Sequence, residues 1–186
     1  CNKTLENNWS RAILINQISS DFYNRQGKAI TNFNNTLPEP HSGLATETLK
    51  DPYKLDFLDL QEKILEKDIE AQLVKHITSF LLELGAGFSF VGQQVPVKID
   101  KQDFYIDLLF YHIKLKCYVV IELKAIEFKA EFAGKMNLYL SAVDDTMKNE
   151  SDNPTIGLLL CQSRRRHLQR TVKKRIPTLF LFRNGN

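Results

Sequence analysis

Residues 103–124 read DFYIDLLFYHIKLKCYVVIELK, and this stretch decides the fold. Two apolar runs rich in β-branched and aromatic residues flank a short polar break, which is the pattern of a β-hairpin. Three ionisable side chains interrupt the apolar runs: Asp107 in the first, and Glu122 and Lys124 in the second. Because an unpaired charge is costly to bury, we expect these groups to have one another, a metal ion or a ligand as partners.

The spacing of these three groups favours a metal site. Glu122 and Lys124 are two residues apart, so in a strand their side chains lie on one face. In a suitable register, Asp107 on the neighbouring strand meets Glu122 across the ladder. Two adjacent carboxylates repel each other unless a cation lies between them, and such oxygen ligands suit Mg²⁺ or Mn²⁺. A lysine beside that cation can hold a nucleophile or stabilise charge that develops on phosphorus.

Two interpretations of the Glu-x-Lys pair follow from the residues alone. One is a metal-dependent site that hydrolyses phosphodiester bonds. The other is a salt-bridged pair of strands, with Glu122 and Lys124 solvated at a sheet edge. The apolar residues beside Glu122 (VVI) and around Asp107 (DLLF) predict interior positions and therefore favour the first interpretation.

The flanking sequence predicts an α/β chain with a mixed sheet. Apolar residues at helical spacing predict one helix over 60–84 and another over 130–148. The almost continuous apolar run 155–161 predicts a buried, parallel strand. Strands joined by turns short enough for an antiparallel meander are expected over 88–99, 104–112 and 117–124. The order helix, three strands, helix, strand is typical of an α/β fold.

Glu70 and the cysteines stand out within these elements. Glu70 lies inside the apolar arc of the first helix, so its side chain either extends to solvent near the helix start or points at the hairpin site. Cys117 and Cys161 lie in apolar runs without CxxC spacing, which predicts small buried residues rather than a zinc site or a disulfide. Cysteine usage of this kind fits the reducing cytoplasm.

The N-terminal part differs in composition from the rest. Residues 7–26 show a helical apolar pattern, and residues 27–52 are rich in Gly, Asn, Thr and Pro, which indicates a linker or surface loop. We therefore expect 1–52 to be the remnant of an N-terminal helical domain with its linker, followed by a core over 53–162. Because the chain begins at Cys1, we expect a fragment or a processed protein.

Charge is concentrated at the C-terminal end. The segment 163–186 carries eight Lys or Arg and no acidic residue, whereas the whole chain has 25 basic and 22 acidic residues. Everything before this tail is thus acidic overall, so nucleic-acid binding has to come from local patches. The tail contains a candidate strand over 178–182 that either packs on the sheet or is free. The sequence has no apolar run long enough to span a membrane.

The run from Glu70 to Cys161 resembles the PD-(D/E)XK nuclease superfamily and, more narrowly, the bacterial YhcG-like family. The segments Asn7–Ser10 and Lys50–Leu60 are similar to the end of that family's N-terminal domain and its connector. The stretches that carry the resemblance are FLLELGAGFSFVGQQ (80–94), DFYIDLLFYHIKLKCYVVIELK (103–124), EFAGKMNLYLSAVDD (131–145) and NPTIGLLLC (153–161).

The resemblance implies a restriction-endonuclease-like αβββαβ core with a central mixed sheet flanked by helices. It implies that Asp107, Glu122 and the backbone carbonyl of Leu123 bind Mg²⁺ or Mn²⁺. The site residues that it further implies are Lys124 as the catalytic lysine, Glu70 as an acid that assists the metal, and Gln94 and Lys135 as polar groups near the site, with Lys135 as a candidate phosphate contact. His76 and His112 match no catalytic position and are expected to be surface or satisfied core residues.

The tail lies outside the resemblance. Arg164, Arg165 and Arg166 belong either to a DNA-contacting extension or to an altered, partly disordered C-terminus. Three function classes stay open: a Mg²⁺-dependent DNA nuclease of repair, restriction or defence, a non-catalytic nucleic-acid-binding or assembly module with the same fold, and an RNA nuclease. The first is favoured because a module that only binds has little reason to keep all three hairpin groups. The expected partner is DNA rather than a membrane, in the cytoplasm, with a homodimer as a candidate assembly.

Overall fold

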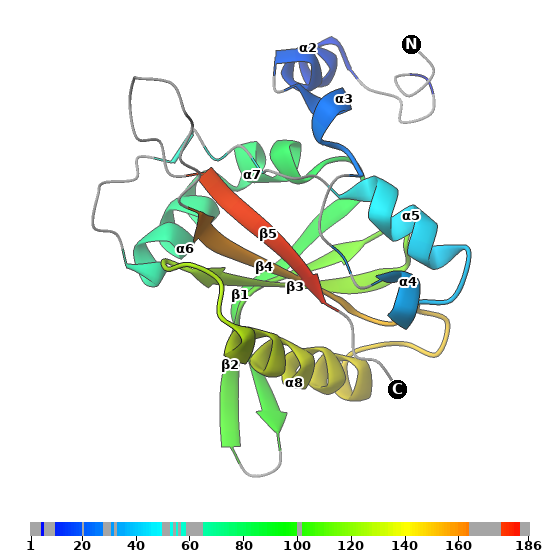
Figure 1. Cartoon of the computed structure of the whole chain (residues 1–186), viewed down its shortest axis with the longest axis vertical. Coiled ribbons are helices and arrows are strands. Elements are labelled where there is room, and N and C mark those ends of the chain that lie inside the picture. The colour runs from blue at the N-terminus through cyan, green and yellow to red at the C-terminus, as the bar shows by residue number, and fades with distance from the viewer. Residues whose placement is uncertain are drawn as a thin grey trace.

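A five-stranded mixed sheet forms the centre of the molecule, in the order β1-β2-β3-β4-β5 (Figure 1). The computed structural model describes residues 5, 10–19, 21–27, 31, 33–49, 53, 55, 57–58, 65–99, 102–163 and 176–182. The strands are β1 (Phe88–Ile99), β2 (Gln102–His112), β3 (Cys117–Lys124), β4 (Ile156–Ser163) and β5 (Ile176–Phe182). The helices are α2 (Arg11–Ser19), α3 (Phe22–Arg25), α4 (Phe33–Thr36), α5 (His41–Thr48), α6 (Glu66–Lys75), α7 (Ile77–Leu84) and α8 (Ala130–Thr146).

The strand pairing confirms the predicted meander. The pairs β1–β2 and β2–β3 are antiparallel, whereas the pair β3–β4 is parallel. The register of β1 against β2 shifts between Phe90 and Gly92, as at a β-bulge. The mixed α/β sheet with flanking helices is therefore as expected from the sequence.

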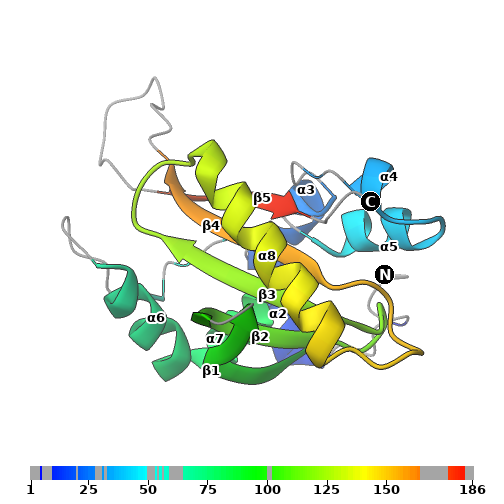
Figure 2. The same ribbon diagram turned by 90° about the horizontal axis from the view of Figure 1, so that it is seen from below.

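Each face of the sheet has its own hydrophobic cluster, because successive side chains of a strand point to opposite faces. On β3, Val119, Ile121 and Leu123 pack with residues of α4–α7, whereas Val120 packs with α8. Figure 2 shows α8 lying across one face of the sheet, with the other helices behind it. Glu122 alternates with Ile121 and Leu123, so its side chain lies on the α8 face.

A glycine allows α8 to approach the sheet closely. An added Cβ on Gly157 of β4 would lie 2.5 Å from the sulfur of Met136 on α8. The Tyr139 hydroxyl, also on α8, donates a hydrogen bond to the Tyr105 carbonyl of β2 over 3.0 Å. These contacts fix α8 against both halves of the sheet.

The helix expected over 60–84 is two helices, with α6 ending and α7 beginning at His76. The φ and ψ of His76, −107° and 33°, lie outside the helical range. The break redirects the chain, so Leu73 on α6 and Phe80 and Leu84 on α7 are all fully buried. Residues 60–64 lie outside the part of the chain that the structure describes.

The prediction of a loop or linker over 27–52 is wrong. Helices α4 and α5 occupy much of it, and Phe33, Leu37, Ala45 and Leu49 are buried in the same cluster as the sheet. The pairs 33/37 and 45/49 have helical spacing, so their burial in the core outweighs the Gly, Asn and Pro content that suggested a loop. Whether a domain boundary lies at residue 52 stays a prediction.

The apolar stripe expected on the helix over 7–26 is also wrong. The helix breaks at Asp21, whose φ of 57° is left-handed, and Ile18 is 71% exposed. Gln17 and Arg25 are buried instead, and Arg25 forms an ion pair with Glu83 of α7. Polar anchors rather than an apolar stripe attach this segment to α7.

Part of the C-terminal segment joins the sheet. β5 pairs antiparallel with β4, from Gly157 opposite Phe182 to Ser163 opposite Ile176. Of the two alternatives for the candidate strand, packing on the sheet is therefore the one observed. Arg164, Arg165 and Arg166 lie outside the described residues. Among the residues described, no helix has the length and apolar character needed to cross a bilayer.

Candidate active site

Asp107 and Glu122 face each other at the point where the β2–β3 ladder ends. The last backbone pair is Leu108 with Ile121, and one step further along the same register brings Asp107 opposite Glu122. The Asp107 carboxylate accepts a hydrogen bond from the Leu123 N–H over 2.8 Å. The register that the sequence interpretation needed is therefore present.

Gln94 extends this row onto β1. Its neighbours Gln93 and Val95 pair with Leu108 and Ile106, so Gln94 lies opposite Asp107. Its φ of 47° is left-handed, which is uncommon for a residue other than glycine and costs about 1–3 kcal/mol. Its side-chain amide donates a hydrogen bond to Glu70 Oε2 over 2.7 Å. Such strain is often found at functional sites.

Glu122 has an unusual environment for a buried carboxylate. Its exposed fraction is 2%. Oε2 accepts a hydrogen bond from Lys135 Nζ over 3.3 Å and lies 3.6 Å from Lys124 Nζ, whereas Oε1 is buried without a hydrogen-bond partner among the residues that the structure describes. Burial and repulsion from Asp107 raise the pKa of Glu122 to about 7, although the two lysines act in the opposite direction. One oxygen is thus available for a further cationic ligand.

The pKa of the Asp107 carboxyl is also raised by burial. The Leu123 N–H and the ammonium groups of Lys124 and Lys135 lower that pKa. Two adjacent carboxylates whose pKa values are both raised indicate a place that a cation would stabilise.

This donor set fits a magnesium-type ion. The described residues contain no cluster of three or more His, Cys, Asp or Glu able to hold a metal. Mg²⁺ usually takes only one or two carboxylates and completes its shell with water and substrate phosphate. Asp107, Glu122 and the Leu123 carbonyl are consistent with that requirement.

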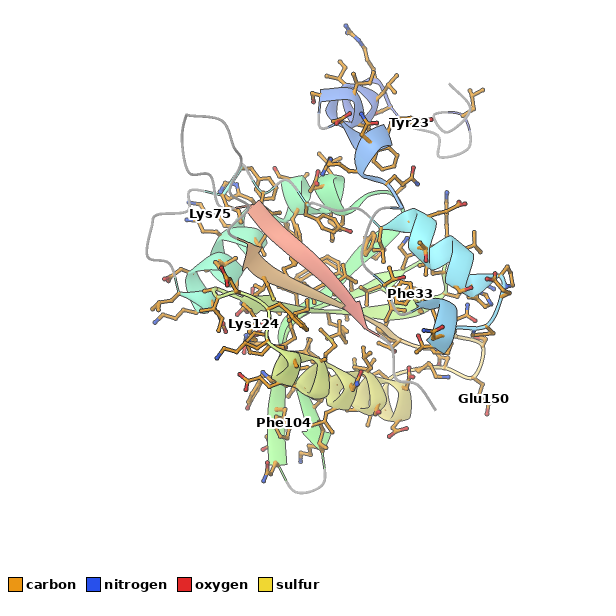
Figure 3. The ribbon with its side chains drawn as sticks, viewed as in Figure 1. Tyr23, Phe33, Lys75, Phe104, Lys124 and Glu150 are labelled. Atoms are coloured by element: carbon orange, nitrogen blue, oxygen red, sulfur yellow. The ribbon has the colours of Figure 1, made fainter. Side chains whose placement is uncertain are left out.

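Lys124 lies beside this pair at the end of β3, between α6 and α8 (Figure 3). Its ammonium donates hydrogen bonds to Glu66 Oε2 over 3.1 Å and to the Leu123 carbonyl over 2.9 Å. The ring of Phe132 lies 5.7 Å from Nζ. The lysine is thus held at the site by carboxylates, a carbonyl and an aromatic face.

Lys135 reaches the site from α8, as expected. Its Nζ lies 5.0 Å from the centre of the Tyr139 ring, and the side chain is 44% exposed. Although burial favours the neutral form, Tyr139 and Glu122 raise the pKa of Lys135 to about 12, so the side chain is cationic. Its ammonium therefore contacts Glu122 in the site, while the side chain is partly exposed to solvent.

Glu70 lies against the site rather than in solvent. It is 8% exposed, and Gln94 holds its carboxylate. Burial raises the pKa of Glu70, the Gln94 hydrogen bond lowers it, and repulsion from Asp107 raises it further. The alternative in which this side chain extends into solvent is therefore wrong, and Glu70 contacts the row of polar groups through Gln94.

Glu66 is a contact that the sequence interpretation missed. Besides Lys124, it accepts a hydrogen bond from the Ala125 N–H over 3.3 Å. Glu66 precedes Glu70 by four residues, so both lie on one face of α6. That spacing was the available signal.

His112 is a core residue, but it is not fully satisfied as expected, because its Nε2 is buried with no hydrogen-bond partner among the described residues. It is 1% exposed, and its Nδ1 accepts a hydrogen bond from the Leu115 N–H over 3.0 Å. His76, at the junction of α6 and α7, is half-buried. Cys117 and Cys161 are buried in the two hydrophobic clusters, which confirms their expected packing role.

Comparisons with known proteins agree with this geometry. A family model described as the YhcG PDDEXK nuclease domain matches residues 46–176, well over half of the chain. The chain is 36% identical over 164 residues to the Escherichia coli (strain K12) protein named "Putative nuclease YhcG". That alignment covers 86% of this chain and 43% of the relative, so the chain spans less than half of the relative's length. No solved structure gives a significant match. The chain therefore belongs to the family of YhcG PDDEXK nuclease domains.

Proposed function

We propose that this chain is a Mg²⁺-dependent nuclease that hydrolyses phosphodiester bonds of DNA. The observation that carries the proposal is Glu122, a buried carboxylate opposite Asp107 with one oxygen that no described residue hydrogen-bonds. A stably folded core gains nothing from such a group, because an unsatisfied buried charge costs several kcal/mol. A divalent cation bound there would remove that cost.

The proposed roles follow from position. Asp107, Glu122 and the Leu123 carbonyl hold the cation, which when bound supplies neutralisation and polarisation of the phosphoryl group. Lys124 holds the attacking water and stabilises the negative charge that builds on the phosphoryl oxygens. Glu70 fixes the Gln94 amide, and this pair orients polar groups at the edge of the site. Burial of Glu122 under α8 keeps bulk water away from the cation-binding carboxylate.

DNA contacts are proposed around the open side of the site. Lys135 has a partly exposed ammonium beside Glu122 and is placed to neutralise a phosphate next to the cleaved bond. Gln94 lies on the exposed side of β1 and can contact the same strand. Arg164, Arg165 and Arg166 are proposed as further phosphate contacts. The cytoplasmic location and the homodimer stay predictions.

Cleavage assays test this proposal directly. Linear, supercoiled and branched DNA would be incubated with the chain and Mg²⁺ or Mn²⁺, with and without a chelator. Glu122→Gln removes the charge at nearly constant shape and should abolish cleavage. The matched control is Glu131→Gln, which changes an exposed glutamate of α8 that pairs with Lys129. Full activity of Glu122→Gln would refute the proposed site, and cleavage of matched RNA but not DNA would reassign the substrate.

A further inference from the structure

The Lys124 ammonium makes two hydrogen bonds and one longer ion-pair contact with the residues that the structure describes. An ammonium has three N–H donors. Around Lys124 Nζ lie three oxygens: the Leu123 carbonyl at 2.9 Å, Glu66 Oε2 at 3.1 Å and Glu122 Oε2 at 3.6 Å. The first two contacts are hydrogen bonds, and the third is an ion pair at a distance beyond that of a hydrogen bond.

Two of these three acceptors belong to the proposed cation site. The Leu123 carbonyl and the Glu122 carboxylate are the groups that a divalent cation would use. The positive charge of Lys124 therefore already lies beside two of the groups that the cation would bind, the Leu123 carbonyl and the Glu122 carboxylate. A cation that binds the Leu123 carbonyl competes with the ammonium for that acceptor, and its charge repels the ammonium from the neighbouring Glu122 carboxylate.

Glu66 is the third acceptor and differs from the other two. It is the first residue of α6, and its side chain is 44% exposed. Its second oxygen accepts the Ala125 N–H, so the carboxylate is fixed to the backbone directly after Lys124. It lies outside the Asp107–Glu122 pair and remains available to Lys124 after the exchange.

We propose that Glu66 is a positioning residue that retains the Lys124 ammonium at the site when a divalent cation takes over Glu122 and the Leu123 carbonyl. The inference rests on the proposed function, because it concerns the same cation site. After the exchange one N–H points to Glu66 and two are free to face the nucleophile and the phosphate. Without Glu66, the displaced ammonium loses its remaining acceptor and either continues to compete with the cation or moves away.

A double-mutant cycle on cation binding tests this role without DNA. Isothermal titration calorimetry with Mn²⁺ would compare the wild type, Glu66→Gln, Lys124→Met and the double variant. Lys124→Met should bind Mn²⁺ about tenfold more tightly, because a competing charge close to the ligands is gone. Glu66→Gln should bind about fivefold more weakly than the wild type, yet have less than a twofold effect in the Lys124→Met background.

The coupling between the two residues separates positioning from a general charge effect. If Glu66→Gln weakens Mn²⁺ binding equally in both backgrounds, Glu66 acts only through its charge and the inference is overturned. The same holds if Glu66→Gln leaves binding unchanged, or if the wild type does not bind Mn²⁺. Glu131→Gln is the matched control, since it also removes a glutamate from the first turn of a helix; it should change the affinity less than twofold.

Cleavage kinetics distinguish failure of this inference from failure of the proposed function. Glu66→Gln should lower kcat by about 10–100-fold with little change in the KM for DNA, because Lys124 is misplaced rather than absent. A wild type that cleaves while Glu66→Gln behaves like Glu131→Gln would end the positioning role and leave the nuclease proposal intact. A wild type that binds Mn²⁺ without cleaving DNA would end the nuclease proposal, and the binding cycle would still decide the role of Glu66.

Discussion

Two buried glutamates, Glu83 and Glu122, have similar exposure but opposite surroundings. Both are at most 5% exposed. Glu83 on α7 meets Arg25 through both oxygens, in the paired geometry in which a guanidinium binds a carboxylate. Glu122 on β3 directs both of its lysine contacts to Oε2, and Oε1 has no hydrogen-bond partner in the described part of the chain. The first carboxylate is satisfied by the fold, and the second is not.

The difference separates a structural charge from one that indicates a site. A bidentate buried pair joins two segments that are distant in the sequence, here α3 and α7, and no additional ligand is needed. An oxygen that is buried without a partner needs an explanation, and a bound ion or a catalytic role is one that also accounts for a neighbouring carboxylate and two lysines. By this criterion Glu83 belongs to the scaffold and Glu122 to the site.

Removing the Glu122 charge should give the largest effect. Glu122→Gln is expected to lower cleavage on the order of 10³-fold or more, because a ligand of the proposed cation is lost. Its thermal unfolding midpoint should be equal to or higher than that of the wild type, since the substitution removes the repulsion between the Asp107 and Glu122 carboxylates. Activity assays and calorimetric melting measure the two effects. A marked fall in stability would show that Glu122 belongs to the scaffold after all.

Breaking the Arg25–Glu83 pair should lower stability and leave activity nearly unchanged, which is the opposite of the effect of Glu122→Gln. Arg25→Met removes the guanidinium that both oxygens of the buried Glu83 carboxylate contact, so it should lower the free energy of unfolding by about 3–5 kcal/mol. Cleavage per folded molecule should change less than about threefold, because neither residue contacts the site. The double variant Arg25→Met with Glu83→Leu should recover much of the stability. Urea unfolding of the three variants checks this, and no recovery in the double variant would contradict the pairwise interpretation.

The sequence allowed the site to be predicted better than the periphery. Alternation along β3 and the short turn before it place Asp107 opposite Glu122 with little freedom, since a slip of one residue would expose the apolar face. Lys124 and Lys135 were found by the same local rules together with the family resemblance. In contrast, the burial of Phe33 and Ala45 depends on tertiary packing of two short helices that have little intrinsic preference for forming alone. The composition of residues 27–52 therefore gave a wrong prediction, because tertiary packing determines the structure of that segment.

Glu66 shows a second limit of the sequence. Its spacing from Glu70 was visible, but its contact with Lys124 requires knowing that α6 begins beside the end of β3. Likewise, the Arg25–Glu83 pair joins residues 58 positions apart, which no local pattern reveals. Both are long-range polar contacts, and single side chains rather than periodic patterns carry them.

His112 is a third buried ionisable group, without an opposite charge as partner, and it should make stability depend on pH. Burial, with Lys114 nearby, lowers the pKa of His112 to about 4 from an ordinary 6.5. The unfolded chain then binds a proton as the pH falls below 6.5 while the folded chain does not, so stability is lost between pH 6.5 and 4, by up to about 3 kcal/mol. Unfolding free energies measured at pH 7 and pH 4.5 should differ less in His112→Asn than in the wild type. An equal pH dependence in both would exclude His112 as the cause.

We expect the smallest effect from replacing Lys135. Its ammonium has two proposed partners, Glu122 and a DNA phosphate. In the free chain it offsets the Glu122 charge, whereas during catalysis it is proposed to contact a phosphate. Lys135→Met should weaken DNA binding by about five- to tenfold and reduce the slope of log affinity against log salt by about 0.9, as expected for one lost phosphate contact. Salt-dependent fluorescence anisotropy measures both, with catalytically inactive Glu122→Gln as the background. Lys129→Met is the control, since that lysine is exposed and pairs only with Glu131 among the ion pairs of the described residues. An unchanged slope in Lys135→Met would assign Lys135 to the charge balance around Glu122 and remove it from the DNA interface.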